Sequence, residues 1–325
     1  MKKVAIGVDI GGTNTAIGVV DELGNVLVKD NILTRTDGNV DLYVDDLTLA
    51  IRELMKSVKL TNADIDFLGI GIGAPNGNYY AGTIEYAANL AFKGIVPLVK
   101  LLKIKFPELQ AISLTNDANA AAIGEMIYGG AKGMKNFVMF TLGTGVGSGI
   151  VVNGDLVYGS DGFAGECGHT TLFPDGRLCG CGGRGHMEAY CSAPGMKRTA
   201  FELMAKYNAN NSLLANKSFT ELDSKAIFEA AEKGDKVALE VFELTGKWLG
   251  ISFADTAHHL SPEAIFLFGG PTAAGDYIFK PTKESMEQNL LTTFKNKIKI
   301  LPSELKPGDA PIVGASALVY KELEK

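Results

Sequence analysis

The chain has 325 residues, of which 46% are hydrophobic and 21% are charged, and its formal net charge at pH 7 is −6. This length allows two domains or one large one, each with its own hydrophobic core. This net charge gives no reason to expect a nucleic-acid partner, because nucleic-acid binding normally needs a basic face.

Targeting signals are not evident in the sequence. The N-terminal stretch "MKKVAIGVDIGGTN" begins with two lysines, but Asp9 and the glycines interrupt its apolar run, which argues against a signal peptide. No run of eighteen apolar residues occurs, so we expect no membrane partner. Four cysteines and no export signal predict a reducing, cytoplasmic location.

Three strands open the chain, and the Gly-rich and Asp/Gly turns between them predict an antiparallel meander. These strands are expected at 3–10, 15–21 and 24–30. The elements predicted next are, in chain order, a helix at 41–58, a buried strand at 66–75, a short helix at 96–106, a strand at 111–117 and a helix at 117–129.

The opening pattern returns at 136–159, "NFVMFTLGTGVGSGIVVNGDLVYG". The turns "IGGTN" and "LGTGV" coincide when the two stretches are superposed, which indicates an internal duplication. The elements predicted beyond it are helices at 193–207, 224–234 and 236–260, a buried strand at 263–270 and a closing helix at 310–325. The sequence therefore predicts two duplicated α/β halves that face a cleft, with Gly turns of both halves pointing into it.

The turn "DIGGTN", residues 9–14, lies between two predicted strands. It is neither a Walker A loop, which needs Gly-Lys-Ser/Thr, nor a Rossmann turn, which a helix would follow. Its glycines let backbone N–H groups approach a phosphate, although a turn chosen only for its geometry is the alternative. A second loop, "LGTGVGSG", favours phosphate binding, because two loops can hold a polyphosphate from opposite sides. The candidate nucleotide-binding residues are Asp9, Gly11, Gly12, Thr13, Asn14, Thr144, Gly145, Gly269 and Gly270.

Asn116 and Asp117 stand at a strand end just before a helix. The plainest interpretation makes Asp117 the N-cap of that helix. An aspartate that faces a cleft can instead accept a proton from a substrate hydroxyl as it attacks a γ-phosphate. The residues alone leave both interpretations open.

The loop "GHTTLFPDGRLCGCGGRGHMEAY" concentrates cysteine and histidine in one place. Cys179 and Cys181 are too close in sequence for an unstrained disulfide with each other. Together with His169 and His186, the two cysteines supply two sulfur and two nitrogen ligand atoms, enough for a tetrahedral structural Zn²⁺ site. The spacing does not match a zinc finger, so a loop that holds no metal is the alternative.

Together these residues resemble the ROK family of sugar kinases and repressors, and within it the chain is most similar to the bacterial glucokinases. The resemblance runs from end to end through "DIGGTN", "NDANAAAIGE", "TLGTGVGSGIVVNGDLVYGSDGFAGECGH" and "CGCGGRGHME". It implies an α/β, duplicated actin-like ATPase (ribonuclease H-like) fold with two domains flanking a cleft. We place the first domain at 1–118, completed by the helix at 311–325, and the larger second domain with the zinc loop at 119–310.

Residue roles follow from the resemblance position by position. It implies that Asp117 is the catalytic base. The residues that it implies for sugar binding are Asn89, Asn116, Asp117, Glu166, His169 and Glu188. The residues that match the phosphate-binding turns are Gly12, Thr13, Thr144 and Gly145, and those that match zinc ligands are His169, Cys179 and Cys181.

The chain departs from the family pattern at two places. His186 stands where the family usually has cysteine, so a longer imidazole replaces a thiolate and the site carries one negative charge less. The stretch "GAPNGNYYAGTIEY" replaces the more usual Gly-Pro-Gly-type segment. That segment lies near the sugar in the family, so the departure weakens any inference about which sugar is preferred.

The resemblance implies ATP-dependent phosphorylation of a hexose, glucose first, at the 6-hydroxyl, with Mg²⁺ bridging the phosphates. This activity belongs to carbohydrate metabolism and glycolysis. The alternatives are a kinase for N-acetylmannosamine, mannose, allose or fructose, and a sugar-sensing repressor. A repressor is expected to carry a helix-turn-helix where only "MKK" precedes the first strand here. We expect a homodimer or higher homo-oligomer, and the sequence does not decide between ATP and polyphosphate as donor.

Overall fold

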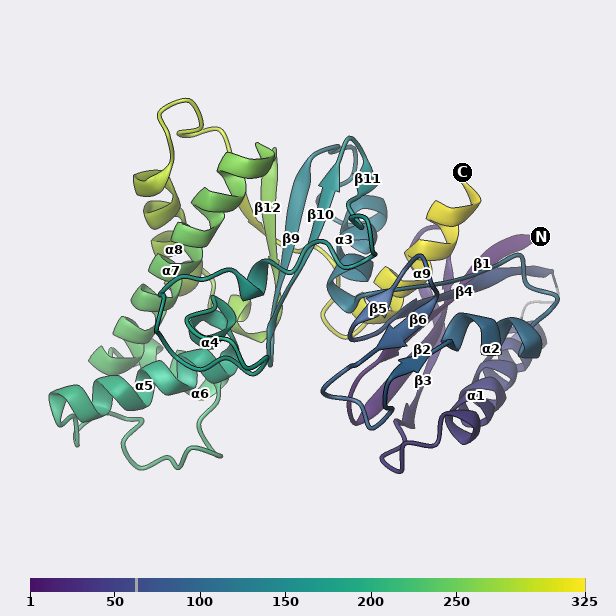
Figure 1. Ribbon diagram of the computed structural model, residues 1–325, viewed down its shortest axis with the longest axis horizontal. Helices are drawn as coiled ribbons and strands as arrows, with labels where there is room; N and C mark the ends of the chain where they lie inside the picture. The colour runs from purple at the N-terminus through teal and green to yellow at the C-terminus, as the bar shows by residue number, and fades with distance from the viewer. Residues whose placement is uncertain (62–63, 325) are drawn as a thin grey trace.

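The computed structural model describes residues 1–61 and 64–324, and two five-stranded sheets dominate it (Figure 1). The first sheet has the order β3-β2-β1-β4-β8 and the second the order β11-β10-β9-β12-β13. The first contains β1 (Lys2–Ile10), β2 (Asn14–Asp21), β3 (Val26–Leu33), β4 (Ile65–Gly73) and β8 (Ala111–Thr115). The second contains β9 (Phe137–Leu142), β10 (Val146–Val152), β11 (Asp155–Leu156), β12 (Ala264–Phe268) and β13 (Lys299–Pro302).

The two sheets repeat one topology. In each, three consecutive strands form an antiparallel meander. Two later strands then add in parallel beside the first strand of that meander. The duplication predicted from the two Gly-rich hairpins is therefore confirmed at the level of strand order and direction.

Residues of β1 alternate between two helical layers. Val4, Ile6 and Val8 face a core that they share with α1 (Val40–Thr61) and α2 (Leu98–Lys105). The opposite face of the sheet is covered by α9 (Ala310–Leu323). There Gly7 permits close approach, because an added Cβ would lie 1.9 Å from the carbonyl oxygen of Ile312. The first sheet is thus sandwiched by helices on both faces.

The second half is built mainly of helices packed on β9 and β12. Phe253 of α7 (Lys236–Leu260) meets Phe140 of β9 with ring centroids 4.6 Å apart, inside a core that contains most of the half. The other helices are α4 (Glu188–Cys191), α5 (Ala193–Tyr207), α6 (Ser224–Glu232) and α8 (Asp276–Asn289). The sequence does not predict α8, which carries Pro281 in its interior. This proline packs on Gly246 of α7, whose added Cβ would meet the ring at 2.6 Å.

Two helices connect the halves. The helix α3 (Asp117–Tyr128) packs on β9 and β10 of the second sheet and on α9, which itself packs on β1 and β4 (Figure 1). This packing of α9 supports our proposal that the closing helix completes the first domain, with the division of the chain near residue 118. No helix in the described part of the chain is both long and apolar enough to cross a bilayer.

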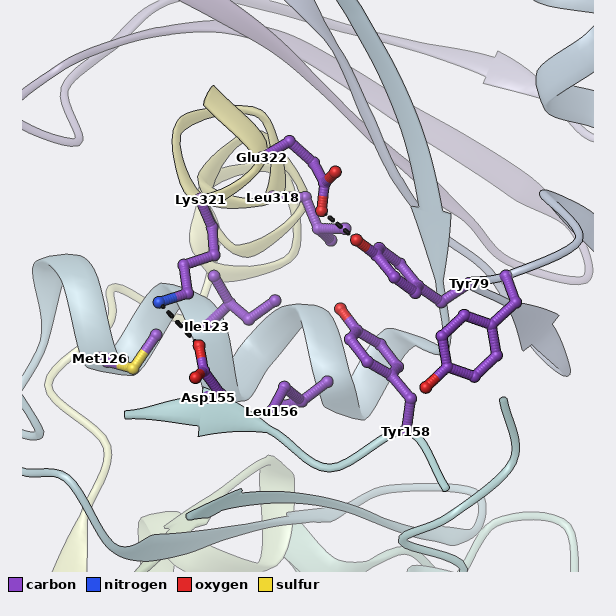
Figure 2. A pocket seen from close by; sticks show the side chains of 10 residues that line it. Tyr79, Ile123, Met126, Asp155, Leu156, Tyr158, Leu318, Lys321 and Glu322 are labelled. Atoms are coloured by element: carbon purple, nitrogen blue, oxygen red, sulfur yellow. Dashed lines mark hydrogen bonds and ion pairs between the residues drawn. The ribbon is translucent and has the colours of Figure 1, made fainter. Parts of the chain in front are cut away.

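A group of tyrosines forms a second junction. A small sheet of β5 (Gly77–Asn78), β6 (Thr83–Glu85) and β7 (Ile95–Val96) leads into it. Tyr79 stacks on Tyr158 with ring centroids 3.9 Å apart, and the hydroxyl of Tyr80 donates to the carbonyl oxygen of Gly159 at 3.0 Å. These rings wall a pocket of about 340 Å³ beside α3 and α9 (Figure 2). The junction joins the small sheet of the first half to the strand end of the second.

Candidate active site

A cleft of about 860 Å³ collects residues from both halves of the chain. Most sequence-predicted site residues line it: Asn89, Asn116, Asp117, Thr144, Gly145, Glu166, His169, Cys181, Glu188, Gly269 and Gly270. The first Gly turn is not part of this lining but touches it, since an added Cβ on Gly12 would meet the carbonyl oxygen of Asn89 at 2.6 Å. The structure therefore brings the predicted sugar residues, the second Gly turn and part of the Cys/His loop to one cleft, with the first Gly turn beside it.

The two Gly turns are held in place by hydrogen bonds to their backbone groups. In the first, the Gly11 N–H donates to the carbonyl oxygen of Asn14 at 2.9 Å, and the Thr34 hydroxyl donates to that of Gly11 at 2.8 Å. In the second, the Gly143 N–H donates to the carbonyl oxygen of Gly145 at 3.0 Å. Thr13 and Thr144 are exposed at the tips of their turns. Each turn thus has an exposed threonine on a backbone that hydrogen bonds hold in one conformation.

The third glycine corner ends β12. Gly269 has φ +117°, and an added Cβ would lie 2.0 Å from the carbonyl oxygen of Leu142 in the neighbouring strand. Only glycine accommodates both the conformation and the contact. Gly270 begins the 3₁₀ turn η2 (Gly270–Ala274) and is exposed in the cleft.

The interpretation of Asp117 as a helix cap is wrong. Asn116 is the N-cap of α3, and its side-chain oxygen accepts the Ala118 N–H at 2.8 Å. Asp117 is the first helical residue, exposed to the cleft at the end of β8, with Oδ1 2.7 Å from the same amide. Desolvation among the surrounding protein atoms raises the pKa of its carboxyl group. Since Asn116 is the N-cap, Asp117 is not needed to cap α3, and its side chain lines the cleft.

Asp9 and Asp117 lie on either side of Gly73, near enough for the charge of one to affect the other. An added Cβ on Gly73 would lie 3.6 Å from Oδ1 of Asp9 and 3.6 Å from the Cα atom of Asp117. Burial raises the pKa of Asp9 to about 7, and the negative charge of Asp117 adds to the shift. None of the described residues that line the cleft is a lysine or arginine. A polyphosphate bound here would therefore need a metal cation to offset its charge, and Mg²⁺ held by phosphate oxygens suits that need.

Ser148 fixes the backbone on both sides of Glu166. Its hydroxyl donates to the carbonyl oxygen of Gly165 and accepts the N–H of Cys167 at 3.1 Å. Ser148 is buried on β10, the strand that follows the second Gly turn. The carboxylate of Glu166 is thus presented to the cleft from a segment tied to the phosphate side of the site. The sequence analysis missed Ser148, which appears there only as part of a glycine-rich loop.

Glu188 links three parts of the site. It begins α4, and its Oε2 accepts the Val146 N–H at 3.0 Å, next to the second Gly turn. Its Oε1 accepts the Cys179 thiol at 3.3 Å. One carboxylate therefore connects the Gly turn to the Cys/His loop.

The Cys/His loop brings four donor atoms together. One donor from each of His169, Cys179, Cys181 and His186 lies within 4.8 Å of the other three. Nδ1 of His186 is 3.2 Å from Sγ of Cys181, and Nδ1 of His169 is 3.9 Å from Sγ of Cys179. All four cysteines of the chain are free thiols. Two sulfurs and two nitrogens at this spacing form a donor set that suits Zn²⁺, with His186 as the fourth member.

The stretch "GAPNGNYYAGTIEY", which departs from the Gly-Pro-Gly-type segment of the family, has a backbone conformation that helps to explain its asparagine. Asn76 has φ +50°, a left-handed conformation that glycine adopts freely and that asparagine tolerates better than most residues. Its side-chain Nδ2 donates to the carbonyl oxygen of Glu85 at 3.0 Å. Asn76 and Tyr86 both line the cleft, and the sequence analysis identified neither. The signal for both was their position in the divergent stretch that leads to Asn89.

Comparisons with known proteins agree along the whole chain. The ROK family profile matches residues 5–322. A glucokinase of Halalkalibacterium halodurans is 34% identical, with 98% of this chain and 95% of that relative covered. A glucokinase of Thermotoga maritima is 32% identical, with 98% of each covered.

A solved structure shows the same fold. It is a ROK family glucokinase from Streptomyces griseus in complex with glucose and AMPPNP, with a TM-score of 0.80 and 32% sequence identity. The superposition covers 98% of this chain and 99% of that one. The fold is therefore the duplicated, two-domain actin-like fold that the resemblance implied, and the chain belongs to the ROK family.

Proposed function

We propose that this protein is an ATP-dependent hexose kinase that transfers the γ-phosphoryl group to the 6-hydroxyl of glucose. The observation that carries the proposal is the position of Asp117, which shares one cleft with the second Gly turn and with the polar residues Asn89 and Glu166. The relatives named glucokinase, and the similar structure that holds glucose and AMPPNP, support the choice of sugar and donor.

Asp117 is the general base of the proposed reaction. It accepts the proton of the 6-hydroxyl while that oxygen forms a bond to the γ-phosphorus, and the bond from the γ-phosphorus to the bridging oxygen breaks with its electrons leaving on ADP. Desolvation raises the pKa of Asp117, which makes its carboxylate a stronger base than a solvated one. The proposed sugar ligands are Asn89, Asn116, Glu166, His169 and Glu188, which line the same cleft.

In this proposal the Gly turns bind the phosphates of ATP, the phosphoryl donor. Backbone amides of Gly12 and Gly145 and the hydroxyls of Thr13 and Thr144 donate to phosphate oxygens. Asp9, Gly11 and Asn14 complete the first turn, and Gly269 and Gly270 border the space for the nucleoside. Mg²⁺ bound to the phosphates would supply the positive charge that the described cleft residues do not provide.

Zinc has a structural role in the proposal. Four protein ligands leave no open position for an activated water, which distinguishes a structural zinc from a catalytic one. His169 faces the cluster through Nδ1, while its Nε2 lies 3.8 Å from Oε2 of Glu166. Metal binding through Nδ1 would fix the tautomer that presents Nε2 to the sugar.

A coupled assay across sugars and donors tests the assignment. We expect the highest kcat/KM with glucose and ATP among glucose, mannose, allose, fructose and N-acetylmannosamine, with ATP and polyphosphate as donors. Proton NMR of the product should place the phosphate on the 6-oxygen. A higher kcat/KM for another sugar would reassign the substrate, and the absence of phosphoryl transfer to every sugar would refute the proposal.

Replacing the base separates chemistry from structure. Asp117→Asn keeps the size of the side chain and removes the proton acceptor, so we expect kcat to fall by at least about a hundredfold. Because Asn116 is the helix cap and desolvation disfavours the charged form of Asp117, the melting temperature should stay the same or rise, and should not fall. Steady-state kinetics and thermal unfolding measure the two effects, and near-normal turnover would contradict the role of Asp117.

A further inference from the structure

Tyr86 is an exposed aromatic residue of the cleft lining with an unusual backbone conformation. It follows β6 directly and lines the same cleft as Asn89, on the wall that the first half provides. Its side chain is 70% exposed. A single exposed aromatic residue is common on protein surfaces, so exposure alone does not indicate a role.

The backbone conformation of Tyr86 is the second observation that points to a role for this residue. Tyr86 has φ +50°, a conformation that is strained for a bulky residue. The neighbouring structure imposes it, since the Tyr86 N–H donates to the carbonyl oxygen of Gly94 at 2.9 Å. Nδ2 of Asn76 also reaches the carbonyl oxygen of Tyr86 at 3.4 Å. Glycine would satisfy the same backbone bonds without strain, so the strain points to a use for the tyrosine ring.

We propose that Tyr86 is a substrate-binding residue whose ring covers the apolar C–H face of the bound hexose. The inference rests on the proposed function. Tyr86 is three residues from Asn89, a proposed sugar ligand, on the first-half wall. The nucleoside corner at Gly269 and Gly270 belongs to the second half. An aromatic ring offers dispersion contacts and a negative π-face to C–H groups, which suits a sugar better than a phosphate.

This contact would also discriminate between sugars. Glucose has equatorial hydroxyls at carbons 2 to 4, so both faces of its ring carry axial C–H groups. Mannose has an axial 2-hydroxyl on one face and allose an axial 3-hydroxyl on the other. An axial hydroxyl directed at the Tyr86 ring would lose hydrogen bonds to water without replacement. Tyr86 would therefore favour glucose over the epimer whose axial group faces it.

Substitutions of Tyr86 by alanine, phenylalanine and glycine test the proposal. Tyr86→Ala removes the ring, and we expect KM for glucose to rise about three- to tenfold, the range of a single aromatic contact. KM for ATP should stay within about twofold, and the preference for glucose over mannose or over allose should fall. Tyr86→Phe keeps the ring face and should keep KM for glucose. Tyr207→Ala is the control, because Tyr207 is also exposed and lies on α5 away from the cleft lining.

Tyr86→Gly tests the strain. It should raise KM for glucose as Tyr86→Ala does, yet melt at a higher temperature than Tyr86→Ala, because glycine accepts a positive φ. An unchanged KM for glucose in Tyr86→Ala, a rise in KM for ATP instead, or preferences over both epimers that stay unchanged would overturn the proposal. The starting enzyme keeps the two hypotheses apart. If it does not phosphorylate glucose, the proposed function fails; if it does and these variants behave normally, only the role of Tyr86 fails.

Discussion

At the scale of single residues, the carboxylates of Asp9 and Asp117 make the site costly to fold. The pKa of Asp9 is raised from an ordinary 3.8 to about 7, first by burial and then by the charge of Asp117. Between pH 4 and 7 the Asp9 carboxyl group therefore binds more protons in the folded protein than in the unfolded chain. Its contribution to the free energy of unfolding falls as the pH rises through this window.

Removing the charge of Asp9 should therefore stabilise the fold. We expect Asp9→Asn to raise the free energy of unfolding of the ligand-free protein at pH 8 by on the order of 1–3 kcal/mol. The gain should shrink toward pH 4, where the original carboxyl group is protonated. Denaturant unfolding at both pH values measures the difference, and an equal effect at the two would contradict the raised pKa. Activity should drop, because Asp9 belongs to the proposed nucleotide-binding turn.

At the scale of elements, β10 serves two parts of the site, because the second Gly turn precedes it and Ser148 brackets Glu166. We expect Ser148→Ala to raise KM for the sugar about three- to tenfold. It leaves two backbone groups beside Glu166 without their partner, at about 1–3 kcal/mol. Ser285→Ala is the matched control, since that buried hydroxyl binds the carbonyl oxygen of Lys247 between α8 and α7. If both variants lose stability and neither changes KM, Ser148 has only a structural role.

The Cys/His loop gives a second prediction at this scale. We expect one zinc per chain by elemental analysis of the purified protein, retained in His186→Cys and lost in His186→Ala. Losing the metal should raise KM for the sugar as well as lower the melting temperature, because Glu188 contacts Cys179 and His169 is both a proposed zinc ligand and a proposed sugar ligand. Fully active protein without zinc, or a His186→Ala variant that binds zinc and sugar normally, would disprove the site.

At the scale of the whole molecule, the cleft lies between two halves that connect through α3, α9 and the tyrosine junction. Sugar residues and Gly turns come from both halves, so we expect glucose to draw the halves together and exclude water. Small-angle scattering should show a smaller radius of gyration in glucose than in buffer. An unchanged profile under conditions where calorimetry shows glucose binding would exclude closure.

The sequence predicts this architecture where signals are local. Hairpins with Gly turns, amphipathic helices and the Cys/His spacing all depend on residues near one another in the chain, and the structure agrees with them. The helix α8 was missed because the packing of Pro281 on Gly246 depends on tertiary context. The small sheet was missed because strands of two or three residues carry no periodic pattern. Ser148 and Tyr86 were missed because their significance lies in contacts and conformation that only the folded backbone defines.

The closing helix also sets an order of events during synthesis. β1 leaves the ribosome long before α9, because the helix that covers one face of its sheet is made about 300 residues later. At Gly7 and Gly71 the sheet lies so close to α9 that an added Cβ would be 1.9 Å from a backbone carbonyl oxygen of the helix, so this face is shaped for α9. A nascent chain therefore carries an uncovered apolar sheet while the second half folds. This sheet therefore matures only after α9 has been made, and until then its uncovered face is the surface that chaperones would meet.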